Sequence, residues 1–169
     1  ESGDVDDALE LLDEAETACR EADGPQGQHL LQLVQGGQAR ARLERGEFEQ
    51  ARRVLEKRCE LCRSAADSGG LQDALGQEAL ACAGLGDLDG LERALDEQEE
   101  VCRDLGRLDW MAGSLSEGAT LLARLDLQEA SQRLGQRLGR VTTLSGGGAD
   151  GAEADRLAVE AARAFASRR

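Results

Sequence analysis

The stretch GDLDGLERALDEQEEVCRDLG, residues 86–106, repeats a pattern that the chain has already used twice. Residues 3–23 read GDVDDALELLDEAETACREAD, and residues 46–66 read GEFEQARRVLEKRCELCRSAA. In each segment, apolar residues stand two, five and nine positions after the opening glycine, which is the spacing of one helical face. A fourth and weaker copy begins at Leu125, so the sequence predicts a helix that recurs about every 40 residues.

The segments between these helices predict a partner helix for each of them. Their bounds are 28–46, 70–86 and 109–126. Equivalent places hold Ala39, Ala79 and Ala119, and small side chains at a repeated site let neighbouring helices approach closely. We therefore expect an all-α fold, an α-solenoid of antiparallel helix pairs with about three and a half to four repeats over residues 1–144.

The C-terminal part of the sequence changes in character. Residues 145–151 are rich in glycine and predict a linker. Residues 152–169 predict a final helix, which either caps the array or begins a further repeat. Because both ends of the sequence fall within a repeat, we expect the chain to be a piece of a longer array.

The composition agrees with a helical protein. Its 169 residues include two Phe, one Trp and no Tyr, so the core has to be built from Leu, Ala and Val. The chain holds 21 Gly but a single Pro, and few β-branched residues from which strands could form. The predicted fold is thus a set of helices separated by glycine turns.

The net charge of -14 excludes several classes of partner. Nucleic-acid binding depends on a basic surface, and anionic membranes attract basic segments, so we expect neither partner. The sequence also holds no apolar run of the roughly 18 to 20 residues that a membrane span needs. We expect a cytoplasmic protein.

The cysteines predict reduced thiols rather than a disulfide framework. The chain has five of them, an odd number, and most fall within helical patterns. Cys59 and Cys62 form a C-x-x-C motif, but no second such motif exists and His29 is the single histidine. We interpret the cysteines as small buried residues and expect no metal and no cofactor. The alternative is a thiol- or zinc-responsive regulator.

No catalytic arrangement can be recognised. The single histidine leaves no obvious base for a serine or cysteine nucleophile, and the GGGADG stretch lacks the Lys-Ser/Thr of a phosphate-binding loop. We expect a protein that is not an enzyme.

The repeats resemble the tetratricopeptide repeat family. The resemblance covers residues 3 to about 142, and the long period is similar to that of the repeats in kinesin light chains and signalling ATPases. It departs from the family where the aromatic positions are empty, where Leu91 replaces a small residue, and where the fourth turn, Leu125-Asp126, has lost its glycine. The residues that carry it are Gly3-Asp4-Val5 with Ala8, Ala39 with Gly46-Glu47-Phe48 and Ala51, Ala79 with Gly86-Asp87-Leu88, and Ala119 with Asp126-Leu127 and Ala130.

This resemblance implies a ligand groove lined by the first helix of each pair. Carried over by their places relative to the three alanines, and with the single tryptophan added, the expected groove residues are Arg40, Glu44, Gln77, Leu80, Trp110, Glu117, Thr120 and Arg124. Trp110 either anchors a ligand or packs at a junction between repeats. An acidic ligand would depend on Arg40 and Arg124.

The expected function is a noncatalytic scaffold that binds a protein or peptide segment in this groove. One alternative is an intramolecular sensor or spacer of a multidomain signalling protein, with residues 152–169 occupying the groove. Self-association is a further possibility, because residues 1–23 carry a net charge of -9 and residues 40–63 a net charge of +3. That local basic excess can equally be offset by helical pairs such as Glu49 with Arg53.

Overall fold

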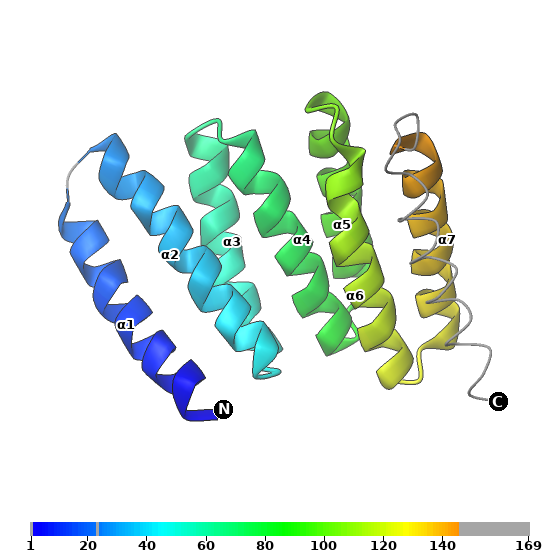
Figure 1. Ribbon diagram of the computed structural model, residues 1–169, viewed down its shortest axis with the longest axis horizontal. Helices are drawn as coiled ribbons and strands as arrows, with labels where there is room; N and C mark the ends of the chain where they lie inside the picture. The colour runs from blue at the N-terminus through cyan, green and yellow to red at the C-terminus, as the bar shows by residue number, and fades with distance from the viewer. Residues whose placement is uncertain (1, 23, 146–169) are drawn as a thin grey trace.

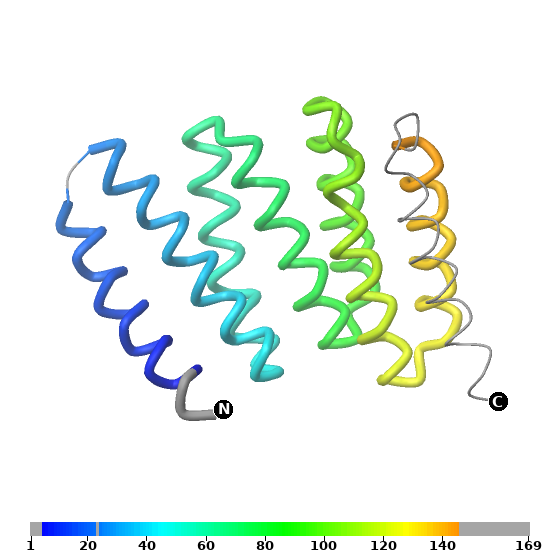
Figure 2. The backbone as a smooth tube through the Cα atoms, in the orientation of Figure 1, coloured from blue at the N-terminus to red at the C-terminus, as the bar shows by residue number. Residues whose placement is uncertain are grey.

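The computed structural model describes residues 2–22 and 24–145, and this part of the chain is all-helical, as predicted. Figure 1 shows the helices lying side by side in chain order, and the tube in Figure 2 shows the short turns that join them. The predicted helix at 152–169, and the linker before it except Ser145, lie outside the described residues. The helices are α1 (Ser2–Glu21), α2 (Pro25–Glu44), α3 (Phe48–Ser64), α4 (Ser68–Leu85), α5 (Leu88–Asp104), the 3-10 helix η1 (Leu108–Trp110), α6 (Met111–Arg124) and α7 (Gln128–Ser145).

Five turns share one hydrogen-bonded geometry, in which a single residue has a positive φ. In the first of them, Glu47 N–H donates to the Arg42 carbonyl at 2.8 Å and Gly46 N–H donates to the Leu43 carbonyl at 3.0 Å. This is the Schellman motif, which satisfies the last carbonyls of a helix. The positive-φ residues are Gly46, Ala66, Gly86, Gly106 and Asp126. They stand 20 residues apart, so two helices with their turns make the predicted period of 40.

The fourth predicted unit begins one residue later than the sequence pattern suggested. Its left-handed residue is Asp126, with φ 62°, rather than Leu125. The turn is intact although it lacks glycine, since Leu127 N–H still donates to the Leu122 carbonyl at 2.9 Å. Aspartate is among the few residues with a side chain that tolerate the left-handed region, which explains why the pattern of glycines misplaced the turn.

Leucines at the same 20-residue interval form the centre of the core. Leu55, Leu75, Leu95 and Leu115 are each at most 1% exposed. The predicted packing points Ala39 and Ala79 are fully buried, while Ala119 is half-buried against the core. The helices α2, α4 and α6 also contact one another, so these alternate helices form one layer.

Two buried polar side chains bridge this layer from behind. Arg58 of α3 lies against Gly36 of α2 and pairs with Asp73 of α4 at 2.7 Å. A Cβ atom at Gly36 would lie 2.9 Å from the guanidinium carbon of Arg58, so only glycine leaves room for it.

Forty residues further along the chain, the arrangement recurs with other chemistry. Gln98 of α5 lies against Gly76 of α4, donates to the Gln72 carbonyl at 3.1 Å and accepts from the Ser114 hydroxyl of α6 at 2.9 Å. Arg58 and Gln98 are 5% and 2% exposed. Each bridge therefore joins two successive helices of the layer.

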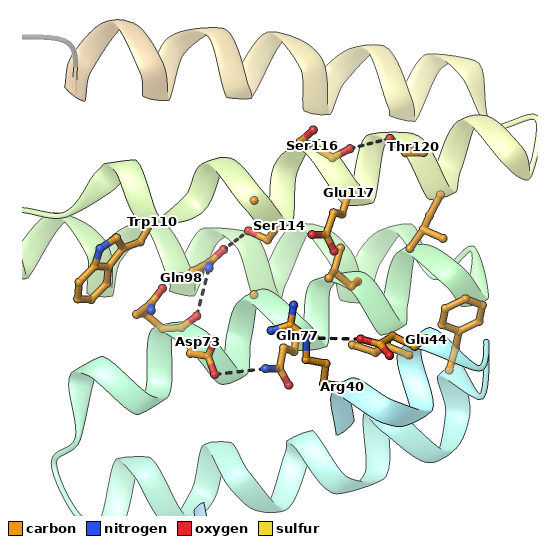
Figure 3. Close-up of a pocket in the computed structure, with 17 residues that line it drawn as sticks. Arg40, Glu44, Asp73, Gln77, Gln98, Trp110, Ser114, Ser116, Glu117 and Thr120 are labelled. Carbon is orange, nitrogen blue, oxygen red and sulfur yellow. Dashed lines mark hydrogen bonds and ion pairs between the residues drawn. The ribbon is translucent and has the colours of Figure 1, made fainter. Parts of the chain in front are cut away.

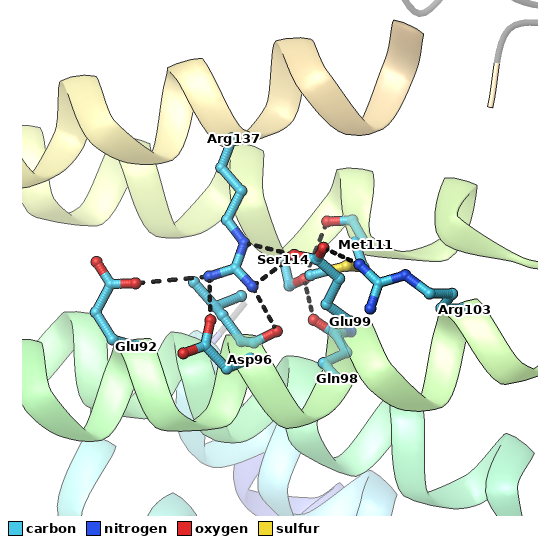
Figure 4. Close-up of polar contacts among 9 residues, drawn as sticks. Glu92, Asp96, Gln98, Glu99, Arg103, Met111, Ser114 and Arg137 are labelled. Atoms are coloured by element: carbon cyan, nitrogen blue, oxygen red, sulfur yellow. Dashed lines mark hydrogen bonds and ion pairs between the residues drawn. The ribbon is translucent and has the colours of Figure 1, made fainter. Parts of the chain in front are cut away.

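A third polar side chain joins α7 to α5 (Figure 4). Arg137 pairs with Glu99 at 2.7 Å, with Asp96 at 2.9 Å and with Glu92 at 3.5 Å. It also donates to the Leu95 carbonyl at 3.0 Å, and its side chain is only 10% exposed. The guanidinium therefore offsets three carboxylates on one face of α5.

None of the helices in the described ranges combines the length and the apolar character that crossing a bilayer requires.

Removing a core leucine should destabilise the array strongly. Leu95→Ala deletes a fully buried side chain and should lower the free energy of unfolding by about 2 to 5 kcal/mol, measured by urea unfolding followed by circular dichroism. Leu11→Ala is the matched control, because Leu11 is 67% exposed, and it should change stability by less than about 0.5 kcal/mol. Equal losses in the two variants would contradict this view of the core.

The Arg137 cluster should contribute to stability through its charge-assisted hydrogen bonds. Arg137→Met keeps an apolar stem of similar length but removes the donors, and should lower the free energy of unfolding by about 1 to 3 kcal/mol. Arg133→Met serves as the control, since Arg133 is exposed on the same helix. A loss of the same size in both variants would show that the cluster adds nothing specific.

Candidate functional site

The helices α2, α4 and α6 enclose one open hollow of about 620 Å³ on their common face (Figure 3). Phe48 from α3, Gln98 from α5 and Trp110 from η1 complete its walls. It lies on the other side of α4 from the cysteine-bearing face where Cys59 contacts Glu78. The hollow is therefore built by the alternate helices that the sequence predicted would line a groove.

Seven of the eight predicted groove residues line this hollow: Arg40, Glu44, Gln77, Leu80, Trp110, Glu117 and Thr120. The eighth, Arg124, is exposed in the last turn of α6, one turn beyond Thr120, and is not part of the lining. The structure thus brings together residues from three separate segments. That they bind a ligand stays a prediction.

The sequence analysis missed about half of the lining. Most of the missed residues stand one helical turn from a predicted one, as Asp73 does from Gln77, so the same helical face extended by four residues would have found them. Gln98 could not be found in this way, because it belongs to a second helix and reaches the hollow through the space beside Gly76. The missed residues are Leu43, Phe48, Gln72, Asp73, Gly76, Gln98, Gly113, Ser114, Ser116 and Leu121.

One part of the hollow is polar and lies toward Trp110 in Figure 3. There the Asp73 carboxylate accepts from Arg58 at 2.7 Å and from the Gln77 amide at 3.3 Å. The buried Oε1 atom of Gln77 has no hydrogen-bond partner among the described residues. This part of the hollow therefore presents acceptors that the chain itself leaves open.

The other part is apolar and is supplied by half-buried residues near the ends of the helices. Phe48 stands at the start of α3 and its ring lies against Gly84, where any Cβ atom would collide with it. The missing side chain at Gly84 is what allows the ring to lie flat on α4. The apolar lining residues are Leu43, Phe48, Leu80 and Leu121.

Trp110 lies on the wall with its side chain 37% exposed, which does not fit its interpretation as a packing residue at a junction. The guanidinium carbon of Arg107 is 4.3 Å from the ring centroid, a cation–π contact. Arg107 is held by Asp109 through two hydrogen bonds of 2.9 Å, and these bonds lower the pKa of the Asp109 carboxyl. The tryptophan ring is thus fixed by its neighbours before any ligand arrives.

The charges of the lining are predominantly negative. Arg40 is its one cation, and Glu44, Asp73 and Glu117 are its three carboxylates. Arg40 already faces Glu44 at 3.6 Å, and both side chains are well exposed. In the described part of the chain, Glu117 forms no ion pair, so its charge is open to a ligand.

The basic segment at residues 40–63 is largely neutralised within the chain. Arg63 pairs with Glu97 at 2.7 Å, and Arg52 pairs with Asp87 at 3.3 Å. The predicted helical pair of Glu49 with Arg53 is present at 3.7 Å. These contacts leave little local excess of positive charge for a head-to-tail contact between two molecules.

The thiols are placed for packing rather than for chemistry. Cys62, Cys82 and Cys102 stand 20 residues apart, and their carbonyls accept the Schellman hydrogen bonds of successive turns. Burial raises the pKa of Cys82 and Cys102 to about 11 and raises the pKa of Cys59 further. The reactive thiolate is therefore scarce at neutral pH.

No metal site accompanies these thiols in the described ranges. Within residues 2–22 and 24–145, no group of three or more His, Cys, Asp and Glu side chains is placed to hold a metal ion. His29 is exposed on α2.

Comparison with protein-family models gave no match, and searches among curated proteins and solved structures gave none either.

Thiol reactivity should separate Cys19 from the other cysteines. At pH 8, a thiol with a pKa of about 11 is ionised in about one molecule in a thousand, so Cys82 and Cys102 should react slowly with Ellman's reagent. Cys19 is only half-buried and should react first, and Cys19→Ser should remove that fast phase. All five thiols should react together in urea. Equal rates in the native protein would contradict the burial of the thiols.

The same shifts should make stability depend on pH in the alkaline range. The ordinary pKa of these thiols is 9.0, and the folded state raises it to about 11 for Cys82 and Cys102. The folded state then holds the protons more tightly, so stability is undiminished below pH 9 and falls as the pH rises toward 11. Urea unfolding of the protein and of Cys82→Ala across that range tests this. The variant, although less stable overall, should lose less stability than the parent on going from pH 9 to 11.

Proposed function

We propose that this chain is a noncatalytic scaffold that binds a peptide or protein segment in the hollow between α2, α4 and α6. The observation that carries the proposal is the convergence of seven predicted residues, from three segments of the sequence, on a single open hollow of about 620 Å³. A hollow of this size, with an apolar part and a few convergent polar groups, is typical of a binding site.

The proposed architecture is an α-solenoid of antiparallel helix pairs, similar to tetratricopeptide repeats. Support comes from the identical turns at 20-residue intervals and from the contacts that each helix makes with the next. Further support comes from the layer formed by α2, α4 and α6, which corresponds to the groove side of such an array.

The proposed mechanism of binding is preorganisation. Arg58 and Gln98 are buried behind the hollow and join successive helices of its wall, so the wall is set before a ligand enters. A preformed surface loses less conformational entropy on binding than a flexible one. The described residues that line the hollow include no histidine and no cysteine, which favours binding over catalysis.

Blocking the hollow should abolish peptide binding. The full chain is immobilised and used to select from random peptides displayed on phage, in parallel with a Thr120→Trp variant whose added indole fills the hollow. Peptides that the parent retains should bind the blocked variant at least about tenfold more weakly. Gln132→Trp is the matched control, because Gln132 is exposed on α7 outside the lining, and it should bind as the parent does. Equal binding to the blocked variant would contradict the proposal.

A further inference from the structure

The chemistry of the lining indicates which kind of segment the hollow accepts, and this inference rests on the proposed function. Glu44, Asp73 and Glu117 supply three carboxylates against the single guanidinium of Arg40. The surrounding chain adds a net charge of -14. A ligand that enters the hollow therefore meets a negative potential both locally and from the whole molecule.

The pairing of these groups sharpens the difference. Arg40 lies 3.6 Å from Glu44, so the one cation of the lining is offset by its own helix. Arg124, the second residue on which an acidic ligand would depend, lies outside the lining. Arg58 offsets Asp73 from behind, which leaves Glu117 as the carboxylate whose charge is open to a ligand.

The hydrogen-bonding groups have the same bias. Gln77 lines the hollow with a buried Oε1 that has no partner among the described residues. Its amide nitrogen is already used on Asp73, and the hydroxyl of Thr120 donates to its own helix at the Ser116 carbonyl. A partner must therefore bring donors rather than acceptors, and lysine and arginine side chains are donors only.

The apolar part requires a second property of the ligand. Leu43, Phe48, Leu80 and Leu121 are half-buried around one part of the hollow and offer contact to a bulky apolar side chain. Figure 3 shows Glu44 and Trp110 toward opposite ends of the hollow, with Gln77 and Glu117 between them. A segment lying along it would contact both the apolar residues and the acceptors.

We propose that the occupant of the hollow is a cationic amphipathic segment of another protein, with a bulky apolar residue among Leu43, Phe48, Leu80 and Leu121 and a lysine or arginine at Glu117 and Gln77. The negative field attracts the segment, and the open acceptors orient it. The apolar contact supplies the larger part of the affinity, since exposed charge pairs contribute modestly.

The phage selection described above decides between the proposals through the composition of the peptides that the parent retains and the Thr120→Trp variant does not. Enrichment of lysine and arginine together with Leu, Ile, Phe, Met or Trp supports the cationic segment. Enrichment of acidic or uncharged peptides overturns it and leaves the binding function standing. If no peptide is retained in preference to the blocked variant, both proposals fail.

A charge reversal then tests the orientation. For a synthetic peptide of the most enriched sequence, Glu117→Lys should weaken binding about tenfold at low salt, and the difference should shrink at high salt. Glu129→Lys makes the same change of charge on exposed α7, outside the lining, and should alter affinity by less than about twofold. Equal effects of the two variants would overturn the contact at Glu117. Titration can be followed by the fluorescence of Trp110, the single tryptophan.

Discussion

The fold depends on one hydrogen-bonded turn that recurs every 20 residues. At each turn a left-handed residue directs two N–H groups back to the last carbonyls of the helix, so every helix ends at a fixed length. Because the lengths match, the buried leucines at the same interval meet at one level of the array. The hollow follows from the same regularity, since alternate helices present the same face side by side.

The sequence alone predicted the helices and the period of about 40, because the apolar spacing and the glycines at 46 and 86 were visible. The finer interval of 20 was hidden, since Ala66 and Asp126 hold left-handed positions without being glycine. A residue with a side chain can adopt that conformation when the surrounding hydrogen bonds fix it, and residue type alone does not reveal this.

The site could be predicted in part, for a related reason. The face of each first helix follows from counting along the chain, and this brought Arg40, Gln77 and Glu117 together. The contribution of Gln98 depends on a close approach between helices at Gly76, which no pattern within one helix contains. The position of Trp110 depends on Arg107 and Asp109 at the start of η1, where a local ion pair and the indole ring fix one another.

The two polar bridges give each repeat an address. Arg58 needs the carboxylate of Asp73, whereas Gln98 needs a hydroxyl and a carbonyl, although both stand at the same place in their units. A chain that slipped by one helix pair during folding would bury a guanidinium opposite Ser114, at a cost of several kcal/mol. Repeated apolar faces would tolerate such a slip, so these polar contacts distinguish the correct order of near-identical units from its permutations.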